Sequence, residues 1–331
     1  MLRYISPQSH LDLITTAISP TRLSTAMSRS NASDSRKVVL ITGCSSGGLG
    51  AALAIDLHKT KQYRVFATAR NTTKLTETRS HGIEDLKLDV LSPSSISSCI
   101  QQLSEVTNGR LDMLINNAGA GYNMPVVDID LTKSKEVFDL NVFSLITVTR
   151  ACLPLLLKSS EAAKVVNNIS IGAYLAMPCQ ATYHASKAAA NSMTECMRLE
   201  FAPFNIQVIA LMTGSVKSNM FNNMKVNHSD DQLPTDSIYR IVPGGLKMMT
   251  QPEKMMTSES DVDAEVWAGQ VVSDLGRKKV PNQIWRGGHA SLARVACHFP
   301  TGLFDGQVKA QSKWDEVEKA VESRSEKERA L

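Results

Sequence analysis

A tyrosine and a lysine four residues apart are the clearest chemical feature of the sequence. They are Tyr183 and Lys187, in the run Tyr-His-Ala-Ser-Lys, and Ser170 precedes the tyrosine by thirteen residues. On a helix, residues i and i+4 share a face, so the lysine ammonium can lie near the phenol. Because a nearby cation favours the phenolate, the pair predicts a tyrosine that transfers a proton, with Ser170 holding a substrate oxygen.

A glycine-rich segment lies earlier in the chain. Residues 42–50 read Thr-Gly-Cys-Ser-Ser-Gly-Gly-Leu-Gly, after a short apolar run and before a helical pattern. In such a turn, backbone N–H groups and the positive end of the helix can hold a pyrophosphate. A tight turn without a ligand is the alternative.

The elements that must position these residues alternate between strands and helices. Apolar runs predict strands at 38–41, 63–69, 86–90, 111–115, 164–169 and 206–211, and helical patterns include 49–60, 134–157 and 181–202. Continuous apolar strands separated by helices imply a parallel sheet covered on both faces. With right-handed crossovers, this predicts an α/β fold, a Rossmann-like doubly wound parallel sheet in a single domain with a C-terminal helical extension. Such folds bind ligands at the carboxyl ends of the strands.

Polar residues follow three of these strands. Arg70 follows the second strand, where an NAD-selective fold has an acid, so we expect a 2′-phosphate and hence NADP(H). Asp89 follows the third strand, where its carboxylate could accept a hydrogen bond from adenine. Asn117, in the run Asn-Asn-Ala-Gly, follows the fourth strand and either lines the cofactor site or only caps the strand end.

Together these motifs resemble the short-chain dehydrogenase/reductase family over residues 37–220. Residues 42–50 resemble its glycine motif, 116–119 its Asn-Asn-Ala-Gly, and 213–218 the segment that contacts the nicotinamide. Four residues match the catalytic tetrad of the family: Asn141, Ser170, Tyr183 and Lys187. The double-glycine loop and the run Trp-Arg-Gly at 285–287 resemble a fungal subgroup that is similar to NADPH-dependent 1-acyldihydroxyacetone-phosphate reductases and includes secondary-metabolite ketoreductases.

The resemblance implies a role for each tetrad member. Tyr183 is then the general acid in ketone reduction and the base in alcohol oxidation, and Ser170 polarises the carbonyl. Lys187 tunes Tyr183 and binds the nicotinamide ribose, and Asn141 holds a water of the proton relay. The expected contacts of NADP(H) are Ile41, Gly43, Ser45, Ser46, Gly48, Leu49, Gly50, Arg70, Asp89, Asn117, Tyr183, Lys187, Val216 and Ser218.

Two positions depart from the family pattern. The glycine loop has one residue more than the commonest form, through Gly47 and Gly48, and Thr213 replaces the usual proline. Neither change removes a reacting group, but both bear on how the phosphates are held.

Composition and charge exclude several classes of protein. The chain has 331 residues, 43% hydrophobic and 21% charged, which is typical of a globular protein and neither disordered nor collagen-like. A net charge of +4 without a basic stripe indicates no nucleic-acid partner. The longest apolar stretch, 143–157, contains polar residues, so no transmembrane helix is expected. The six cysteines lack metal-ligand spacing, which predicts reduced, mostly buried thiols and no metal.

Four segments are expected along the chain. They are a disordered or targeting leader (1–36), an NADP-binding catalytic core (37–220), a substrate lid with C-terminal extension (221–311) and a charged terminal helix (312–331). The lid is rich in methionine, which suits an adaptable apolar pocket or ordinary packing. An apolar stretch at 295–304 either lies on a membrane surface or covers the core or a subunit contact. His184 and His289 are assigned no chemistry.

The predicted function is an NADP-dependent oxidoreductase that reduces a ketone or oxidises the secondary alcohol. Its small-molecule substrate would be lipid-like or a secondary metabolite, with 1-acyldihydroxyacetone phosphate as one candidate. The alternatives are a non-catalytic NADP-binding sensor or scaffold of the same fold, and a lyase or epimerase that uses the same Tyr–Lys pair. The expected location is the cytoplasm rather than mitochondria, with a lipid-droplet or endoplasmic-reticulum surface and a homo-oligomer left open.

Overall fold

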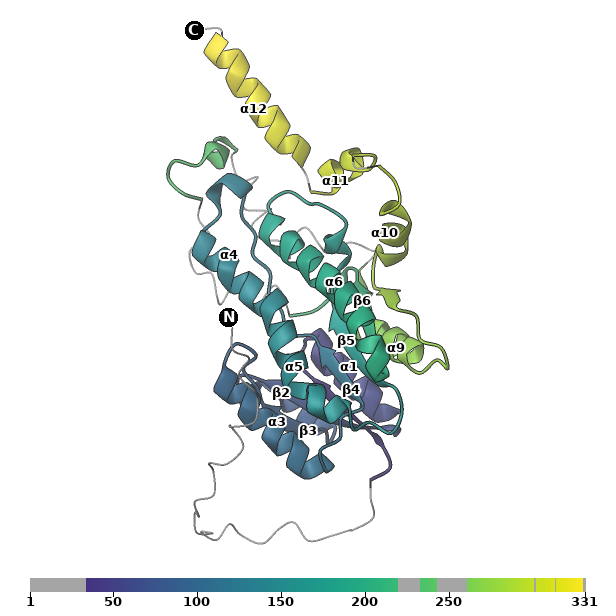
Figure 1. Ribbon diagram of the computed structural model, residues 1–331. Coiled ribbons are helices and arrows are strands. Elements are labelled where there is room, and N and C mark those ends of the chain that lie inside the picture. The colour runs from purple at the N-terminus through teal and green to yellow at the C-terminus, as the bar shows by residue number, and fades with distance from the viewer. Residues whose placement is uncertain (1–33, 220–232, 243–260, 301, 313, 330–331) are drawn as a thin grey trace, which may run out of the picture. The chain divides into compact units, whose positions relative to one another are not determined.

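A seven-stranded parallel sheet forms the centre of the fold, and the turns that carry the sequence motifs follow the carboxyl ends of its strands (Figure 1). The computed structural model describes residues 34–219, 233–242, 261–300, 302–312 and 314–329. The strand order is β3-β2-β1-β4-β5-β6-β9, and the chain reverses direction across the sheet between β1 and β4. The strands are Lys37–Ile41 (β1), Tyr63–Ala69 (β2), Glu84–Lys87 (β3), Met113–Asn116 (β4), Ala163–Asn168 (β5), Ile206–Thr213 (β6) and Gln283–Arg286 (β9). This sheet confirms the predicted α/β fold.

Helices connect these strands. They are Leu49–Lys59 (α1), Thr76–Ser80 (α2), Pro93–Thr107 (α3), Leu131–Phe138 (α4), Ser144–Leu156 (α5), Ala181–Phe201 (α6), Ala264–Leu275 (α9), Ala290–Ala296 (α10), Asp305–Gln311 (α11) and Trp314–Arg329 (α12). Short turns include Thr72–Lys74 (η1), Asp139–Phe143 (η3) and Ile171–Ala173 (η4), and Val216–Lys217 (β7) pairs with Val262–Asp263 (β8). Residues from Arg36 onward form one compact unit.

Alternating side chains of the strands divide the core into two layers. Val38 and Leu40 of β1 pack on the face covered by α3, α5 and α6, which lies toward the viewer in Figure 1. Val39 and Ile41 pack on the opposite face, against α1 and α9. Successive residues of a strand point to opposite faces, so a strand covered on both sides must be apolar throughout. The unbroken apolar runs of the sequence have this cause.

The third strand begins and ends earlier than the predicted 86–90. Strand β3 pairs with β2 only from Glu84 to Lys87, although Leu88 and Val90 beyond it are buried. At Asp89 the chain already turns, because Asp89 Oδ1 accepts a hydrogen bond from Leu91 N at 3.1 Å. The apolar pattern here thus indicates side chains that are buried, and not residues that pair with a neighbouring strand.

A seventh strand was not predicted. Strand β9 pairs in parallel with β6, and Arg286 at its end binds Asp274 of α9 at 2.7 and 3.0 Å. Asp274 is only 3% exposed, so this ion pair fixes α9 against the sheet. The sheet therefore includes residues beyond 220, within the segment expected to form the lid and extension.

The predicted helix 134–157 is divided by a π-helical turn. Helix α4 continues through η3 into α5, and the whole run Leu131–Leu156 is long and apolar enough to cross a membrane by length and composition. Half of its most apolar window is buried inside the protein, as in the core helix of a globular fold. Val148 and Cys152 of α5 pack in the core layer that also contains Val38 and Leu40 of β1.

Several expectations fall outside the described residues. They include most of the leader (1–33) and the methionine-rich parts of the lid (220–232 and 243–260). At the other end, Trp314 and Val317 of α12 pack with Val242 and Tyr239, whereas Val321 is exposed. Of the six cysteines, four are buried: Cys44, Cys99, Cys152 and Cys179.

Candidate active site

A cavity of about 640 Å³ lies at the carboxyl ends of the strands. Its walls come from the glycine loop after β1, the residues after β2, β4, β5 and β6, and the start of α6. It brings together five residues that are far apart in the sequence: Gly43, Arg70, Asn117, Ser170 and Tyr183. Because doubly wound folds bind ligands at this edge of the sheet, the cavity is the candidate active site.

Ser170 is positioned by the turn that follows β5. Its Oγ accepts a hydrogen bond from Gly172 N at 3.0 Å and so caps η4. The residue is buried, and its hydroxyl also forms a hydrogen bond with the phenol of Tyr183. The two hydroxyl groups therefore lie side by side in the cavity, where one carbonyl oxygen can reach both.

The pKa of Tyr183 moves in the direction opposite to the sequence-based expectation. Burial raises this pKa, and the hydrogen bond with Ser170 opposes the rise. Lys187 does share the helix face, with its Nζ 6.0 Å from the centre of the Tyr183 ring. However, Lys187 Nζ donates to the carbonyl of Asn168 at 2.8 Å, and burial lowers its own pKa to about 8. Desolvation thus outweighs the cation in the protein alone.

Asn141 lies in the π-helical turn and is buried. Its Oδ1 accepts from Ala120 N at 2.9 Å, and its Nδ2 donates to Ala120 O at 2.8 Å and to Ser186 Oγ at 2.9 Å. Asn141 is not among the described residues that line the cavity; its amide joins the loop after β4 to helix α6. Its role in holding a relay water stays a prediction.

Asn117 connects the ends of three strands. Its Nδ2 donates to the carbonyls of Thr42 and Gly43 at 2.9 and 3.0 Å, and its Oδ1 accepts from Asn168 Nδ2 at 2.9 Å. A Cβ at Gly50 would lie 2.5 Å from Asn117 Nδ2, so only glycine allows α1 to approach this closely. Asn117 also lines the cavity, and it therefore serves as both strand-end cap and cavity wall.

The glycine loop forms the adjoining wall. Gly43 has φ +72°, and a Cβ there would lie 2.9 Å from the Cα of Ala118. Four of the expected cofactor contacts in this region line the cavity: Gly43, Ser45, Gly48 and Leu49. Three are not among its described lining residues: Ile41, Ser46 and Gly50.

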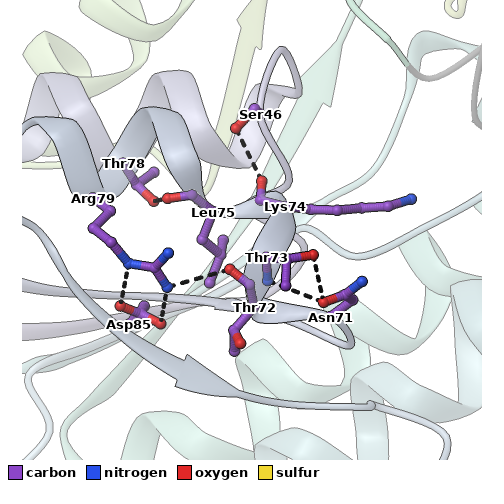
Figure 2. A network of polar contacts seen from close by, with 9 residues as sticks. All are labelled: Ser46, Asn71, Thr72, Thr73, Lys74, Leu75, Thr78, Arg79 and Asp85. Carbon is purple, nitrogen blue, oxygen red and sulfur yellow. Dashed lines mark hydrogen bonds and ion pairs between the residues drawn. The ribbon is translucent and has the colours of Figure 1, made fainter.

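The hydroxyl of Ser46 is used within the protein (Figure 2). It donates to the carbonyl of Lys74 at 2.9 Å and accepts from Glu77 N at 3.1 Å, while Glu77 Oε2 accepts from Gly47 N at 2.7 Å. The extra residue of this loop is therefore part of a connection between the glycine loop and the turn after β2.

Two cations of that turn line the cavity. They are Arg70 and Lys74, both exposed, with Asn71 between them. Within the described part of the chain, neither cation has a hydrogen bond or ion pair through its side chain. Asn71 caps η1 by accepting from Thr73 N at 3.0 Å, and Figure 2 shows the Lys74 side chain extending away from this network. Their charge is available to an anion in the cavity.

The remaining expected cofactor contacts divide into two groups. Val216 and Ser218 line the cavity, whereas Asp89 is not among the described lining residues. Thr213, which stands where the family has proline, donates through Oγ1 to Asn168 Oδ1 at 2.6 Å. A side-chain hydrogen bond thus holds the backbone that a proline ring would otherwise restrict.

Both histidines that were set aside line the cavity. His184 borders the same space as Tyr183, and His289 enters it from the N-terminus of α10. Burial lowers the pKa of His184 to about 4, and the backbone of Leu175 opposes that change. His184 follows Tyr183 on α6, whereas His289 comes from a separate segment at the start of α10, so no single spacing in the sequence relates the two.

Comparison with known proteins shows which family the chain is similar to. Residues 37–229 match the family described as short chain dehydrogenase. A short-chain dehydrogenase/reductase from Pestalotiopsis microspora is 40% identical, over 86% of this chain and 97% of the relative. An NADPH-dependent 1-acyldihydroxyacetone phosphate reductase from Schizosaccharomyces pombe is 33% identical, over 83% and 94%. The crystal structure of a short-chain dehydrogenase from Streptomyces avermitilis is similar at a TM-score of 0.65 and 26% identity, over 87% and 98%. The chain therefore belongs to the short-chain dehydrogenase/reductase family of oxidoreductases.

Proposed function

We propose that the protein reduces a ketone with NADPH, with Tyr183 donating the proton and Ser170 holding the carbonyl oxygen. The observation that supports this most directly is the hydrogen-bonded Ser170–Tyr183 pair, in one cavity with the glycine loop and Arg70. A positioned general acid of this kind contributes roughly 100- to 10,000-fold to a rate. Oxidation of the secondary alcohol would use the same groups in reverse.

The choice of NADPH rests on charge. Arg70 and Lys74 offer two cations without partners in the described chain, which suits the 2′-phosphate. The glycine loop fits a pyrophosphate. A Cβ at Gly48 would lie only 2.9 Å from Ser45 O, so glycine at this position leaves the backbone of the loop open to the phosphates. The cofactor supplies the hydride when bound, and the protein supplies geometry and charge.

The substrate class follows from the rest of the lining. Beyond Ser170 the cavity wall is largely apolar, through Ile171, Leu175, Met177 and Val308. Such a wall suits a ketone with an acyl or similar apolar body. The relatives support the same class, since one is named for reducing 1-acyldihydroxyacetone phosphate. Cytoplasmic location and contact with a lipid surface stay predictions.

Replacing Tyr183 with phenylalanine tests the mechanism. We expect Tyr183→Phe to lower turnover of NADPH with a panel of ketones at least about 100-fold, because the general acid is lost. The dissociation constant of NADPH should stay within about twofold, since the ring remains.

Tyr174→Phe is a matched control. Tyr174 is partly exposed, accepts from Asn191 Nδ2 at 3.0 Å and does not belong to the cavity lining. It should keep wild-type turnover. Wild-type turnover by Tyr183→Phe would remove the phenol from the mechanism.

A further inference from the structure

We propose that Asn123 and Gln180 bind a second, uncharged oxygen of the substrate, beside the carbonyl that is reduced. The ligand would be a ketone that carries another carbonyl, ester or hydroxyl oxygen. This inference rests on the proposed function, and it adds specificity residues to the same cavity.

Asn123 is a buried amide without a partner. It is 9% exposed and lines the cavity together with Ser170 and Tyr183. Its Nδ2 is shielded from solvent and has no hydrogen bond, and no described residue hydrogen-bonds to its amide oxygen. A buried amide without a hydrogen-bond partner costs free energy, so an unpaired amide in a cavity wall indicates that a bound molecule pairs with it. A ligand oxygen in the cavity would supply the missing partner.

The backbone around Asn123 is held on both sides. Tyr122 is buried, and its phenol oxygen accepts from Asp130 N at 3.0 Å. Met124 is buried as well, and its N–H donates to the carbonyl of Cys179 at 2.7 Å. Asn123 is therefore a fixed part of the wall, next to the segment that leads into α6.

Gln180 stands at the end of that segment, three residues before Tyr183. Its Oε1 contacts His184 Nε2 at 3.1 Å, and because an amide oxygen only accepts, the imidazole nitrogen donates. The amide nitrogen of Gln180 has no partner in the described chain, and the residue lines the cavity. Gln180 thus offers an anchored N–H donor near the reacting tyrosine.

The charge state of this wall favours an uncharged oxygen. The low pKa of His184, about 4, keeps its ring neutral at pH 7. The ring is fixed against Gly172, where a Cβ would lie 3.0 Å from His184 Cδ2. Asn123, Gln180 and His184 are therefore three neutral polar groups on one wall. Neutral amides match a carbonyl or hydroxyl oxygen, and a site built to bind it discriminates against a substrate that lacks it.

The test compares two substrates that differ only in the second oxygen. A simple alkyl ketone and the β-diketone of equal chain length are reduced with NADPH by the full-length protein. For the wild type we expect kcat/KM to favour the diketone at least tenfold, which corresponds to about 1.4 kcal/mol. Asn123→Leu should remove most of this preference, mainly through KM for the diketone.

Two further variants separate specificity from folding. Asn282→Leu changes an exposed asparagine outside the cavity lining and should keep the wild-type preference. Gln180→Leu should reduce the preference as Asn123→Leu does, so the inference can still be tested if one of the two variants fails to fold. A wild type that reduces both ketones equally, or an Asn123→Leu protein that keeps the preference, overturns the inference alone. A wild type that reduces neither ketone contradicts the proposed function instead.

Discussion

Replacing Arg70 with alanine tests how the cavity distinguishes NADPH from NADH. The guanidinium is exposed, lines the cavity and has no partner in the described chain, so its removal leaves no other group unpaired. A hydrogen bond to a charged group contributes about 1.5–3 kcal/mol, and solvent screening at this exposed site favours the lower end. About 1.5 kcal/mol corresponds to a roughly tenfold weaker dissociation constant for NADPH. NADH lacks the 2′-phosphate and should bind as before.

Titration of the protein with each dinucleotide, followed by nicotinamide fluorescence, gives the two dissociation constants. Lys74→Ala should act in the same direction, because its ammonium borders the same part of the cavity. Lys278→Ala is the control, since it removes an exposed cation outside the cavity lining. Equal weakening of NADPH and NADH binding by Arg70→Ala would refute a role in reading the phosphate, as would no weakening of either.

Two further predictions use the tyrosine–lysine helix and the turn after β5. The pKa of Lys187, about 8 against an ordinary 10.5, means that the folded state binds fewer protons between these values. The free energy of unfolding, measured with urea, should therefore rise with pH across this window for the wild type relative to Lys187→Met. A difference between the two proteins that does not change with pH would contradict a lowered pKa of Lys187 in the folded state. Gly172→Ala places a Cβ 3.0 Å from His184 and 3.3 Å from Ser170 Oγ, so turnover should fall while NADPH binding persists. Gly306→Ala, with no atom within 4 Å of the new Cβ, should keep normal turnover; equal turnover of both variants would show that the turn tolerates the methyl group.

The strands that could be predicted are those covered on both faces. Strand β2 has the predicted bounds, Tyr63–Ala69, because six of its seven residues are buried and only Arg64 is half-buried. Strand β9 has only four residues, and Gln283 and Arg286 at its ends are half-buried. Its place in the sheet depends on pairing with β6 and on the ion pair to Asp274, which are contacts with distant segments. No local pattern contains that information.

The break in the helix before the site has a similar origin. The apolar pattern runs through 134–157 without a signal for a π-helical turn. In the structure, Asn141 lies in that turn, with both ends of its amide bound to Ala120 in the loop after β4. A π-helical turn inserts a residue into a helix and is frequent at functional sites. The identity of Asn141 could be predicted from the family motif, but the turn that presents it could not.

The electrostatics of the tyrosine show why residue types alone give the wrong sign. From the sequence, a lysine one turn away favours the phenolate. In the folded chain, burial acts on both groups and disfavours charge on each, so the pKa of Tyr183 rises and that of Lys187 falls. The lysine also donates a hydrogen bond to the carbonyl of Asn168 rather than to the phenol. The protonated phenol is consequently the resting form of the protein alone, and it is the form that donates a proton to a ketone as hydride arrives.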